Sequence, residues 1–268
     1  FYTSHDGINW KFKNQVQDKR FGRILECPDI FEVDGVHVFE GSAMYIADGS
    51  CGYENHAICA TAEFDREQCN LRLTGEVQYV DYGMDLYAPQ TNLDHEGRRV
   101  MIAWMRMPQP VTEAEGIKWN GMMCLPRVVE VENGHVCYRV HPEVRKYFNE
   151  VAASSQEWNP LEPFCIKVCL EEGEKLNIGG YQIQRCDRRI LTDRSKVFAD
   201  LKEYALTAKS PKVSGECRLE IFVDRNLVEI YINDGEYVIS QVVYGLTDII
   251  EVETDKNNIT YLRHNSDR

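Results

Sequence analysis

Residues 227–240 read LVEIYINDGEYVIS, in which two apolar runs flank the turn residues Asn-Asp-Gly at 233–235. An Asp-Gly pair between alternating apolar runs favours a tight turn with positive φ, so this segment predicts a β-hairpin. Further short β-rich runs bounded by turn residues occur at 36–39, 100–104 and 219–223. Many short strands at such spacing predict an all-β fold, in the form of a propeller, a barrel or a sandwich.

A single segment favours a helix, at about residues 142–147. It begins with a proline, which is favoured at the first helical position, and an acidic residue follows directly. The stretch after it, 149–163, is polar and contains two prolines. We therefore predict one domain over residues 1–148, a linker at 149–154 and a second domain over 155–268.

Charge and cysteine content narrow the class of protein. The net charge of −13 over 268 residues argues against nucleic acid and anionic membranes as partners, because both repel an acidic surface. The ten cysteines form no CxxC pair, and the seven histidines show no HExxH spacing, so we expect no metal and no cofactor. We expect reduced thiols in a cytoplasmic protein, with disulfides as the alternative.

The first candidate for chemistry is the motif ECPD at residues 26–29. It places the carboxyl groups of Glu26 and Asp29 beside a proline, in front of a strand. Taken alone, such acids are more often solvated or capping than catalytic.

The second candidate is the stretch 81–91, which combines two acids, two tyrosines, an amide and a hydroxyl around a glycine. Sugar sites need these groups, because carboxylates accept hydrogen bonds from hydroxyls and aromatic rings cover apolar sugar faces. The alternative is a hydrogen-bonded loop. Trp104, which ends a strand, fits a buried core as well as a sugar platform.

Taken together, these motifs resemble glycoside hydrolase family 32, which includes invertases, sucrose-6-phosphate hydrolases, inulinases and levanases. The resemblance covers nearly the whole chain and is weakest at 43–69 and 182–212. Its motifs occur in one order: SHDGINW at 4–10, ECPD at 26–29, DYG to YAPQ at 81–90, RVMIAWM at 99–105, LPR at 125–127, and a strand pair at 221–231. It implies the later blades of a five-bladed β-propeller followed by a C-terminal β-sandwich.

The resemblance also implies a reaction, the retaining hydrolysis of terminal β-fructofuranosyl bonds in sucrose, sucrose 6-phosphate or fructans. Such enzymes use two carboxyl groups roughly 5 Å apart. Glu26 matches the family's acid/base residue. Cys27, Asp81, Tyr87 and Trp104 match residues that contact the sugar.

The family's nucleophile motif, Trp-Met/Leu-Asn-Asp-Pro, and its Arg-Asp-Pro motif do not occur in this sequence. Asn-Asp-Gly at 233–235 lacks the tryptophan and the proline. We therefore expect a fragment, a truncated product or one piece of a longer protein, which supplies the acid/base without the nucleophile. The isolated chain should then hydrolyse sucrose and inulin negligibly.

Three further expectations concern association, phosphate recognition and the alternatives to an enzyme. Absent blades would leave an open sheet edge, which favours association into a homo-oligomer. A basic group is needed to recognise a 6-phosphate, and Arg106, Lys118 and Arg127 are the candidates. The alternatives to an enzyme are a carbohydrate-binding module without catalysis, and a structural fragment whose sandwich mediates oligomer contacts.

Overall fold

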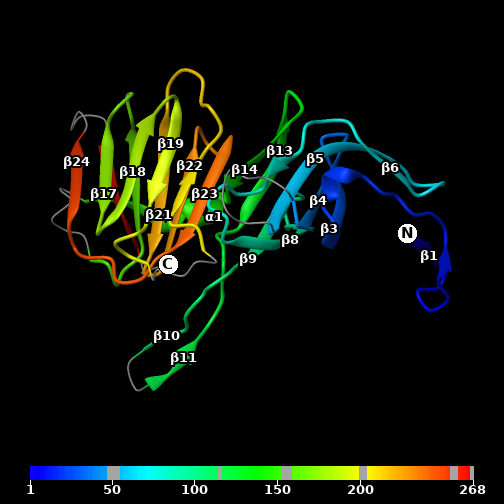
Figure 1. Ribbon diagram of the computed structural model, residues 1–268, viewed down its shortest axis with the longest axis horizontal. Coiled ribbons are helices and arrows are strands. Elements are labelled where there is room, and N and C mark those ends of the chain that lie inside the picture. The colour runs from blue at the N-terminus through cyan, green and yellow to red at the C-terminus, as the bar shows by residue number, and fades with distance from the viewer. Residues whose placement is uncertain (47–54, 114–115, 153–158, 199–203, 254–258, 266–268) are drawn as a thin grey trace.

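The computed structural model describes residues 1–46, 55–113, 116–152, 159–198, 204–253 and 259–265. Within these ranges the chain is almost entirely β, as the sequence predicted. The N-terminal half forms two five-stranded antiparallel sheets and two short two-stranded ones, and the C-terminal half forms a six-stranded and a five-stranded sheet packed face to face (Figure 1).

The first sheet has the order β3-β4-β5-β6, and β7 also pairs with β5. Its strands are β3 (Ile24–Val33), β4 (Val36–Met44), β5 (Asn55–Asp65), β6 (Asn70–Leu73) and β7 (Gln78–Tyr79). Before it lie β1 (Tyr2–Thr3), β2 (Lys11–Phe12) and a 3-10 turn at Lys19–Phe21. The strand β4 is buried over most of its length, because it is paired on both edges.

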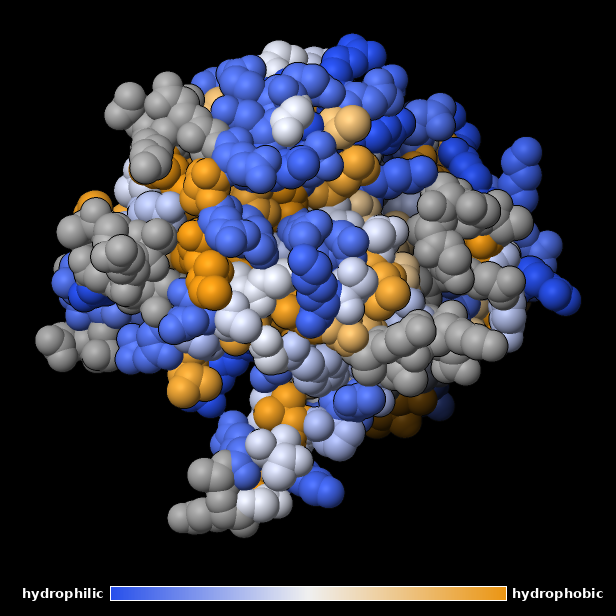
Figure 2. All heavy atoms as spheres, turned by 60° about the vertical axis from the view of Figure 1, so that its left-hand side comes forward, coloured by the Kyte–Doolittle hydropathy of each residue, from blue (hydrophilic) through white to orange (hydrophobic). Residues whose placement is uncertain are grey.

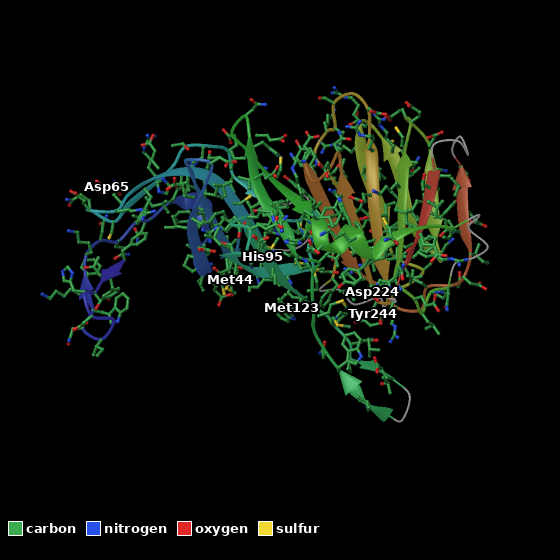
Figure 3. The ribbon with its side chains drawn as sticks, turned by 180° about the vertical axis from the view of Figure 1, so that it is seen from behind. Met44, Asp65, His95, Met123, Asp224 and Tyr244 are labelled. Atoms are coloured by element: carbon green, nitrogen blue, oxygen red, sulfur yellow. The ribbon has the colours of Figure 1, made fainter. Side chains whose placement is uncertain are left out.

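The second sheet has the order β12-β9-β13-β14, with β8 also paired to β9. Its strands are β8 (Leu86–Leu93), β9 (Arg99–Met105), β12 (Met122–Met123), β13 (Arg127–Glu132) and β14 (His135–Val140). Between β9 and β12, the hairpin of β10 (Val111–Thr112) and β11 (Lys118–Trp119) extends away from the body of the molecule (Figures 1 and 3).

The two C-terminal sheets form a sandwich. One has the order β15-β25-β16-β21-β22-β23 and the other β20-β19-β18-β17-β24. The first contains β15 (Phe148–Val151), β16 (Phe164–Cys169), β21 (Arg218–Asp224), β22 (Leu227–Ile232), β23 (Tyr237–Val242) and β25 (Ile259–His264). The second contains β17 (Lys175–Ile178), β18 (Tyr181–Cys186), β19 (Arg189–Asp193), β20 (Thr207–Lys209) and β24 (Ile250–Glu253).

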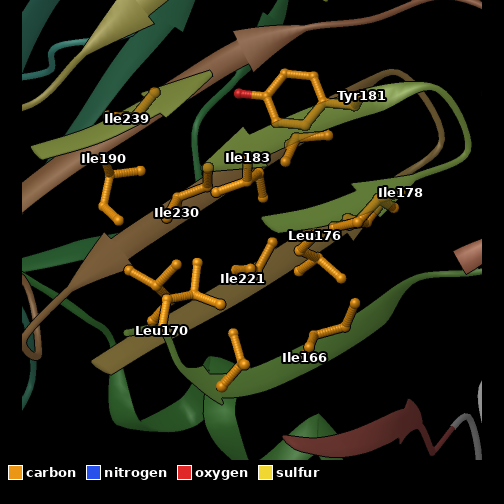
Figure 4. Close-up of a cluster of buried hydrophobic side chains, with 14 of the residues drawn as sticks. Ile166, Leu170, Leu176, Ile178, Tyr181, Ile183, Ile190, Ile221, Ile230 and Ile239 are labelled. Carbon is orange, nitrogen blue, oxygen red and sulfur yellow. The ribbon is translucent and has the colours of Figure 1, made fainter. Parts of the chain in front are cut away.

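Alternation along the strands builds the sandwich core. On β18, Tyr181 and Ile183 are buried while Gln182 is exposed, as expected for a strand with one face turned inward. Isoleucine, leucine and valine side chains from both sheets fill the space between them (Figure 4). On the outside of the sandwich, hydrophilic side chains dominate, with apolar ones between them (Figure 2).

The predicted hairpin and helix are both confirmed. Strands β22 and β23 pair in register, and Asn233, Asp234 and Gly235 all have positive φ. At Gly235 a Cβ atom would lie 2.2 Å from the carbonyl oxygen of Tyr138, so the turn also packs against β14. The helix α1 spans Pro142–Tyr147, as expected from its proline.

Residues just after α1 belong to the sandwich. β15 follows the helix directly and pairs with β25, so 149–151 form a strand where the sequence predicted a linker, because β25 offers its free edge. Ala152 continues this pairing, because its N–H donates to the carbonyl oxygen of Tyr261 at 3.0 Å. Residues 153–154 of the predicted linker lie outside the described residues, and the division at 148 and 155 stays a prediction. The helices of the described residues are too short and too polar to span a bilayer.

Candidate active site

The strand β3 is interrupted where the ECPD motif lies. Pairing with β4 shifts between Glu26 and Asp29, and Cys27 adopts a φ of 48°. Pro28 in this bulge has no N–H to donate, so it suits an interrupted position. Bulges redirect side chains, and here the Glu26 side chain is exposed at the edge of the sheet.

The strand β8 carries the same kind of interruption. Pairing with β9 shifts between Tyr87 and Gln90, and Ala88 has a φ of 53° beside Pro89. The two bulges contact one another, because the Gln90 side-chain amide donates to the carbonyl oxygen of Cys27 at 3.0 Å.

Side chains from the two bulges are bonded directly. The Tyr87 hydroxyl donates to Oε2 of Glu26 at 2.9 Å. The backbone N–H and the hydroxyl of Thr91 both donate to Oδ2 of Asp29, at 3.0 and 2.7 Å. The two carboxylates of the motif therefore have different partners: Asp29 is held by β8 at two points, whereas Glu26 accepts one tyrosine hydroxyl.

Trp104 lies beside this group. It is the cross-strand partner of Tyr87, so the two side chains share one face of the sheet. Its side chain is 44% exposed. Gly121, with a φ of 86°, lies behind the ring, and a Cβ there would come within 2.9 Å of the indole Nε1. The exposed indole is thus a flat apolar surface next to Glu26 and Tyr87.

The guanidinium of Arg106 packs against the ring of Tyr87. The Arg106 group lies 4.9 Å from the centre of the Tyr87 ring and donates to the carbonyl oxygens of Met84 and Asp85. Burial raises the pKa of the Tyr87 hydroxyl, and the bond to Glu26 raises it further. Tyr87 is therefore a protonated hydrogen-bond donor to the carboxylate at neutral pH.

The first half of the 81–91 stretch lies elsewhere. Asp81 is buried, and its Oδ1 accepts from the backbone N–H of Gly83 and of Ser240, each at 2.8 Å. Its Oδ2 lies 2.9 Å from Nη2 of Arg127. Burial raises the pKa of Asp81, and the positive charge of Arg127 opposes this effect.

Arg127 joins a second carboxylate from the sandwich. Its Nη2 is 2.8 Å from Oε2 of Glu229, and Oε1 of Glu229 accepts from the N–H of Leu125 at 2.7 Å. The guanidinium has no solvent exposure. The LPR motif therefore fastens the second sheet to β22.

Asp85 makes a similar bond. Both of its carboxylate oxygens pair with the Arg194 guanidinium, at 2.5 and 3.0 Å, and Oδ2 also accepts from the N–H of Val242. Neither side chain of this ion pair is exposed. Sequence reasoning missed Arg194, which lies in the range 182–212 where recognisable motifs are sparse.

Comparison with known protein families finds two models that match this chain. The model "Glycosyl hydrolases family 32 N-terminal domain" matches residues 1–142, and "Glycosyl hydrolases family 32 C terminal" matches residues 125–265. The chain belongs to glycoside hydrolase family 32. Its two N-terminal sheets are later blades of the family's β-propeller, and its C-terminal half is the β-sandwich, as predicted.

Relatives in this family carry related names. A sucrose-6-phosphate hydrolase of Vibrio alginolyticus is 30% identical over 257 residues, which are 89% of this chain and 52% of that protein. A levanase of Bacillus subtilis is 26% identical, over 90% of this chain and 42% of the levanase. The chain thus spans about half the length of the relatives it matches.

Solved structures in family 32 share the fold. A sucrose-6-phosphate hydrolase from Lactobacillus gasseri superposes with a TM-score of 0.83 at 18% identity, covering 99% of this chain and 60% of that one. A β-fructofuranosidase of Bombyx mori in complex with sucrose gives a TM-score of 0.74 at 19% identity, covering 98% of this chain and 60% of that one.

The structure brings together four of the five predicted site residues, Glu26, Cys27, Tyr87 and Trp104. The prediction that Asp81 contacts the leaving sugar needs correction, because its side chain is only 1% exposed and forms an ion pair with Arg127. We assign Asp81 to the contact between propeller and sandwich. Among the described residues, no group of three or more His, Cys, Asp or Glu side chains is arranged to hold a metal ion.

Proposed function

We propose that this chain is the part of a β-fructofuranosidase that carries the acid/base carboxylate, Glu26, and one wall of the fructosyl site. The observation that supports this most directly is the 2.9 Å hydrogen bond from Tyr87 to Glu26, made where two bulged strands of adjacent blades meet. Membership of family 32 supports the reaction class.

The proposed mechanism uses each side chain for one task. In a retaining glycosidase, one carboxyl group protonates the leaving oxygen while another attacks the anomeric carbon. Glu26 is exposed and can reach a sugar, and the Tyr87 hydroxyl fixes the position of its Oε2. Trp104 covers an apolar face of the sugar, and Cys27 lies next to the acid. We propose that another segment supplies the nucleophile, since no aspartate here lies in the family's motif.

The substrates we propose are sucrose and sucrose 6-phosphate, with fructans as the alternative. Relatives named for sucrose 6-phosphate and one named levanase all match, so the names alone do not separate them. Of the three basic candidates for a 6-phosphate, Arg127 is excluded because it is buried against two carboxylates. Arg106 is the best placed, because its guanidinium lies over Tyr87.

The test is a comparison of two variants in the full-length parent protein. Glu26→Gln removes the transferable proton with little change in shape, so we expect kcat on sucrose to fall by about 10²–10⁴-fold. The matched control is Glu32→Gln, an exposed glutamate on the same strand beyond the bulge. Unchanged kcat in the Glu26 variant would remove Glu26 from the mechanism.

The division of labour has a separate test. Purified 268-residue chain should show negligible turnover of sucrose and inulin. Robust turnover that is abolished by Glu26→Gln would show that the chain contains its own nucleophile. Fructose affinity that survives Glu26→Gln, with no turnover in the full-length parent, would instead support a carbohydrate-binding module.

Two expectations about the protein in the cell remain proposals. We propose a cytoplasmic location because of the cysteine content, and the cysteines of the described residues include six buried thiols. Thiol titration of protein taken from its native source, before and after reduction, would test this. A homo-oligomer stays a prediction, and sedimentation of the purified chain would test it.

A further inference from the structure

A cavity of about 770 Å³ lies between the sandwich and the propeller. This volume is within the range of roughly 300–1,000 Å³ that small-molecule sites occupy. The sandwich contributes β18, β19, β20 and residues 210–212, and the propeller contributes Tyr79, Tyr82 and Met84. Glu26, Cys27, Tyr87 and Trp104 are not among the lining residues, so the cavity is separate from the candidate active site.

The sandwich wall consists of two rows of side chains, all but one of them polar. Cross-strand partners point to the same face of a sheet, and residues between them, such as Ile183 and Ile190, are buried on the opposite face in the core of the sandwich. One row consists of Gln182, Asp193 and Thr207. The row beside it consists of Gln184, Leu191 and Lys209. Amide, hydroxyl, carboxylate and ammonium groups therefore face the cavity together, which suits a ligand rich in hydroxyl groups.

The propeller wall is aromatic. The rings of Tyr79 and Tyr82 are 5.6 Å apart and meet edge to face. Tyr79 also packs on His56, and Tyr82 packs on Tyr237, which keeps both rings in place. Tyrosine offers an apolar face with a polar tip, and this combination suits the apolar face of a sugar ring.

The charge of the lining is opposite to that of the whole chain. The lining contains three cationic side chains, Arg189, Lys209 and Lys212, but only one carboxylate, that of Asp193. Even with Asp187, which lies 3.3 Å from Lys212, cations remain in excess, although the chain carries a net charge of −13. Arg189 also donates to the carbonyl oxygen of Ser210, which fixes the guanidinium at the cavity wall.

We propose that this cavity binds a phosphorylated sugar. A neutral sugar would use the amides and the tyrosine rings but would leave the cationic excess without a counterpart. A small inorganic anion would pair with Lys209 and Arg189 but would leave most of the cavity and both rings unused. A sugar phosphate satisfies both walls, with the phosphate toward the cations and the ring against the tyrosines.

Calorimetric titration of the purified 268-residue chain tests the proposal. With glucose 6-phosphate as the probe, in phosphate-free buffer of low ionic strength, we expect saturable binding that weakens as salt is added. Glucose and inorganic phosphate, titrated separately, should each bind at least about tenfold more weakly, because each uses one wall only. Equal affinity for inorganic phosphate or for glucose would overturn the proposal.

Variants then locate the site. Lys209 is exposed, so Lys209→Gln should leave the melting temperature unchanged while weakening glucose 6-phosphate binding about tenfold, the usual loss for one charge-assisted hydrogen bond. The matched control is Lys175→Gln on β17 of the same sheet, outside the cavity lining. Wild-type affinity in the Lys209 variant would overturn the proposal.

A last variant separates the two sites. Glu26→Gln should bind glucose 6-phosphate as the wild type does, whatever its effect on hydrolysis in the full-length parent. Loss of binding in this variant would place the sugar phosphate at the Glu26 site and overturn the second site. Failure of the hydrolysis test alone leaves this result unaffected, so the two proposals fail independently.

Discussion

One continuous segment, 81–91, serves two regions of the molecule in opposite ways. Its first half carries Asp81 and Asp85, both fully buried and both paired with an arginine, Arg127 or Arg194. Its second half carries Tyr87, which donates to the exposed carboxylate of Glu26. One end of the segment therefore joins two domains through its aspartates, and the other end lines a candidate active site through its tyrosine.

The partner and the burial of a carboxylate therefore indicate whether its role is structural or functional. A buried carboxylate paired with a guanidinium holds the structure together, because removing either partner leaves an uncompensated buried charge, which is costly. An exposed carboxylate that accepts a hydrogen bond from a neutral hydroxyl, as Glu26 does from Tyr87, is accessible to a ligand. Variants that break one region should therefore change stability, and variants that break the other should change activity.

The largest expected effect is on the buried side. Arg194→Met leaves Asp85 buried without its guanidinium, so the free energy of unfolding should fall by about 3–5 kcal/mol. Urea unfolding of the 268-residue chain, followed by circular dichroism, measures this.

The control for that experiment is an exposed ion pair. Arg72 and Glu63 are 2.6 Å apart, but their side chains are 65% and 66% exposed, so Glu63→Gln should cost less than about 1 kcal/mol. Equal losses in the two variants would mean that burial does not distinguish the pairs.

The next effect concerns the backbone of the same contact. At Gly83 a Cβ atom would lie 1.9 Å from the carbonyl oxygen of Ser240, and that oxygen belongs to a paired strand that cannot easily move. Gly83→Ala should therefore lower the free energy of unfolding by about 1–3 kcal/mol, as overpacking usually does. An unchanged urea midpoint would show that 81–85 can shift away from β23 without cost.

A third prediction concerns Glu40, a carboxylate that is buried like Asp85 but accepts a neutral hydroxyl as Glu26 does. Glu40 is buried, yet its nearest partner is a neutral hydroxyl, that of Tyr138, which donates to Oε1 at 2.5 Å. Burial raises the pKa of Glu40 from 4.5 to about 8. The unfolded chain thus loses this proton at lower pH than the folded chain does.

The sign of the pH dependence follows from this order. Below pH 4.5 both states hold the proton, and the contribution of Glu40 to stability is complete. As the pH rises toward 8, ionisation favours the unfolded state, so stability falls by up to about 1.4 kcal/mol per pH unit. Unfolding of wild type and Glu40→Gln at pH 6 and pH 7.5 measures the slope, which should be shallower in the variant. Parallel slopes would contradict the raised pKa.

Local signals in the sequence predicted much of the fold and part of the site. The turn at 233–235 and the helix at Pro142–Tyr147 depend on residues close in the chain, and both formed as expected. The two bulges also have a local sign, since Pro28 and Pro89 each interrupt a strand.

Asp81 was assigned to the wrong site because its bonding partners are distant in the sequence. Asp81 is bonded to Ser240, 159 residues away in the chain, and Asp85 to Arg194, 109 residues away. No local pattern around Asp81 distinguishes an interdomain contact from a sugar contact, because both require a carboxylate in a polar segment. Only the packing of the sandwich against the propeller decides between them.

The smallest effect on stability is expected at the exposed side. Tyr87→Phe removes one hydrogen bond to a carboxylate that solvent can reach and leaves the buried ring in place, so the free energy of unfolding should fall by only about 1 kcal/mol. In the full-length parent the same change should lower kcat on sucrose about tenfold, because the acid loses the donor that positions it. A variant that unfolds like Arg194→Met while keeping its kcat would reverse the comparison, and would place Tyr87 with the residues that hold the domains together.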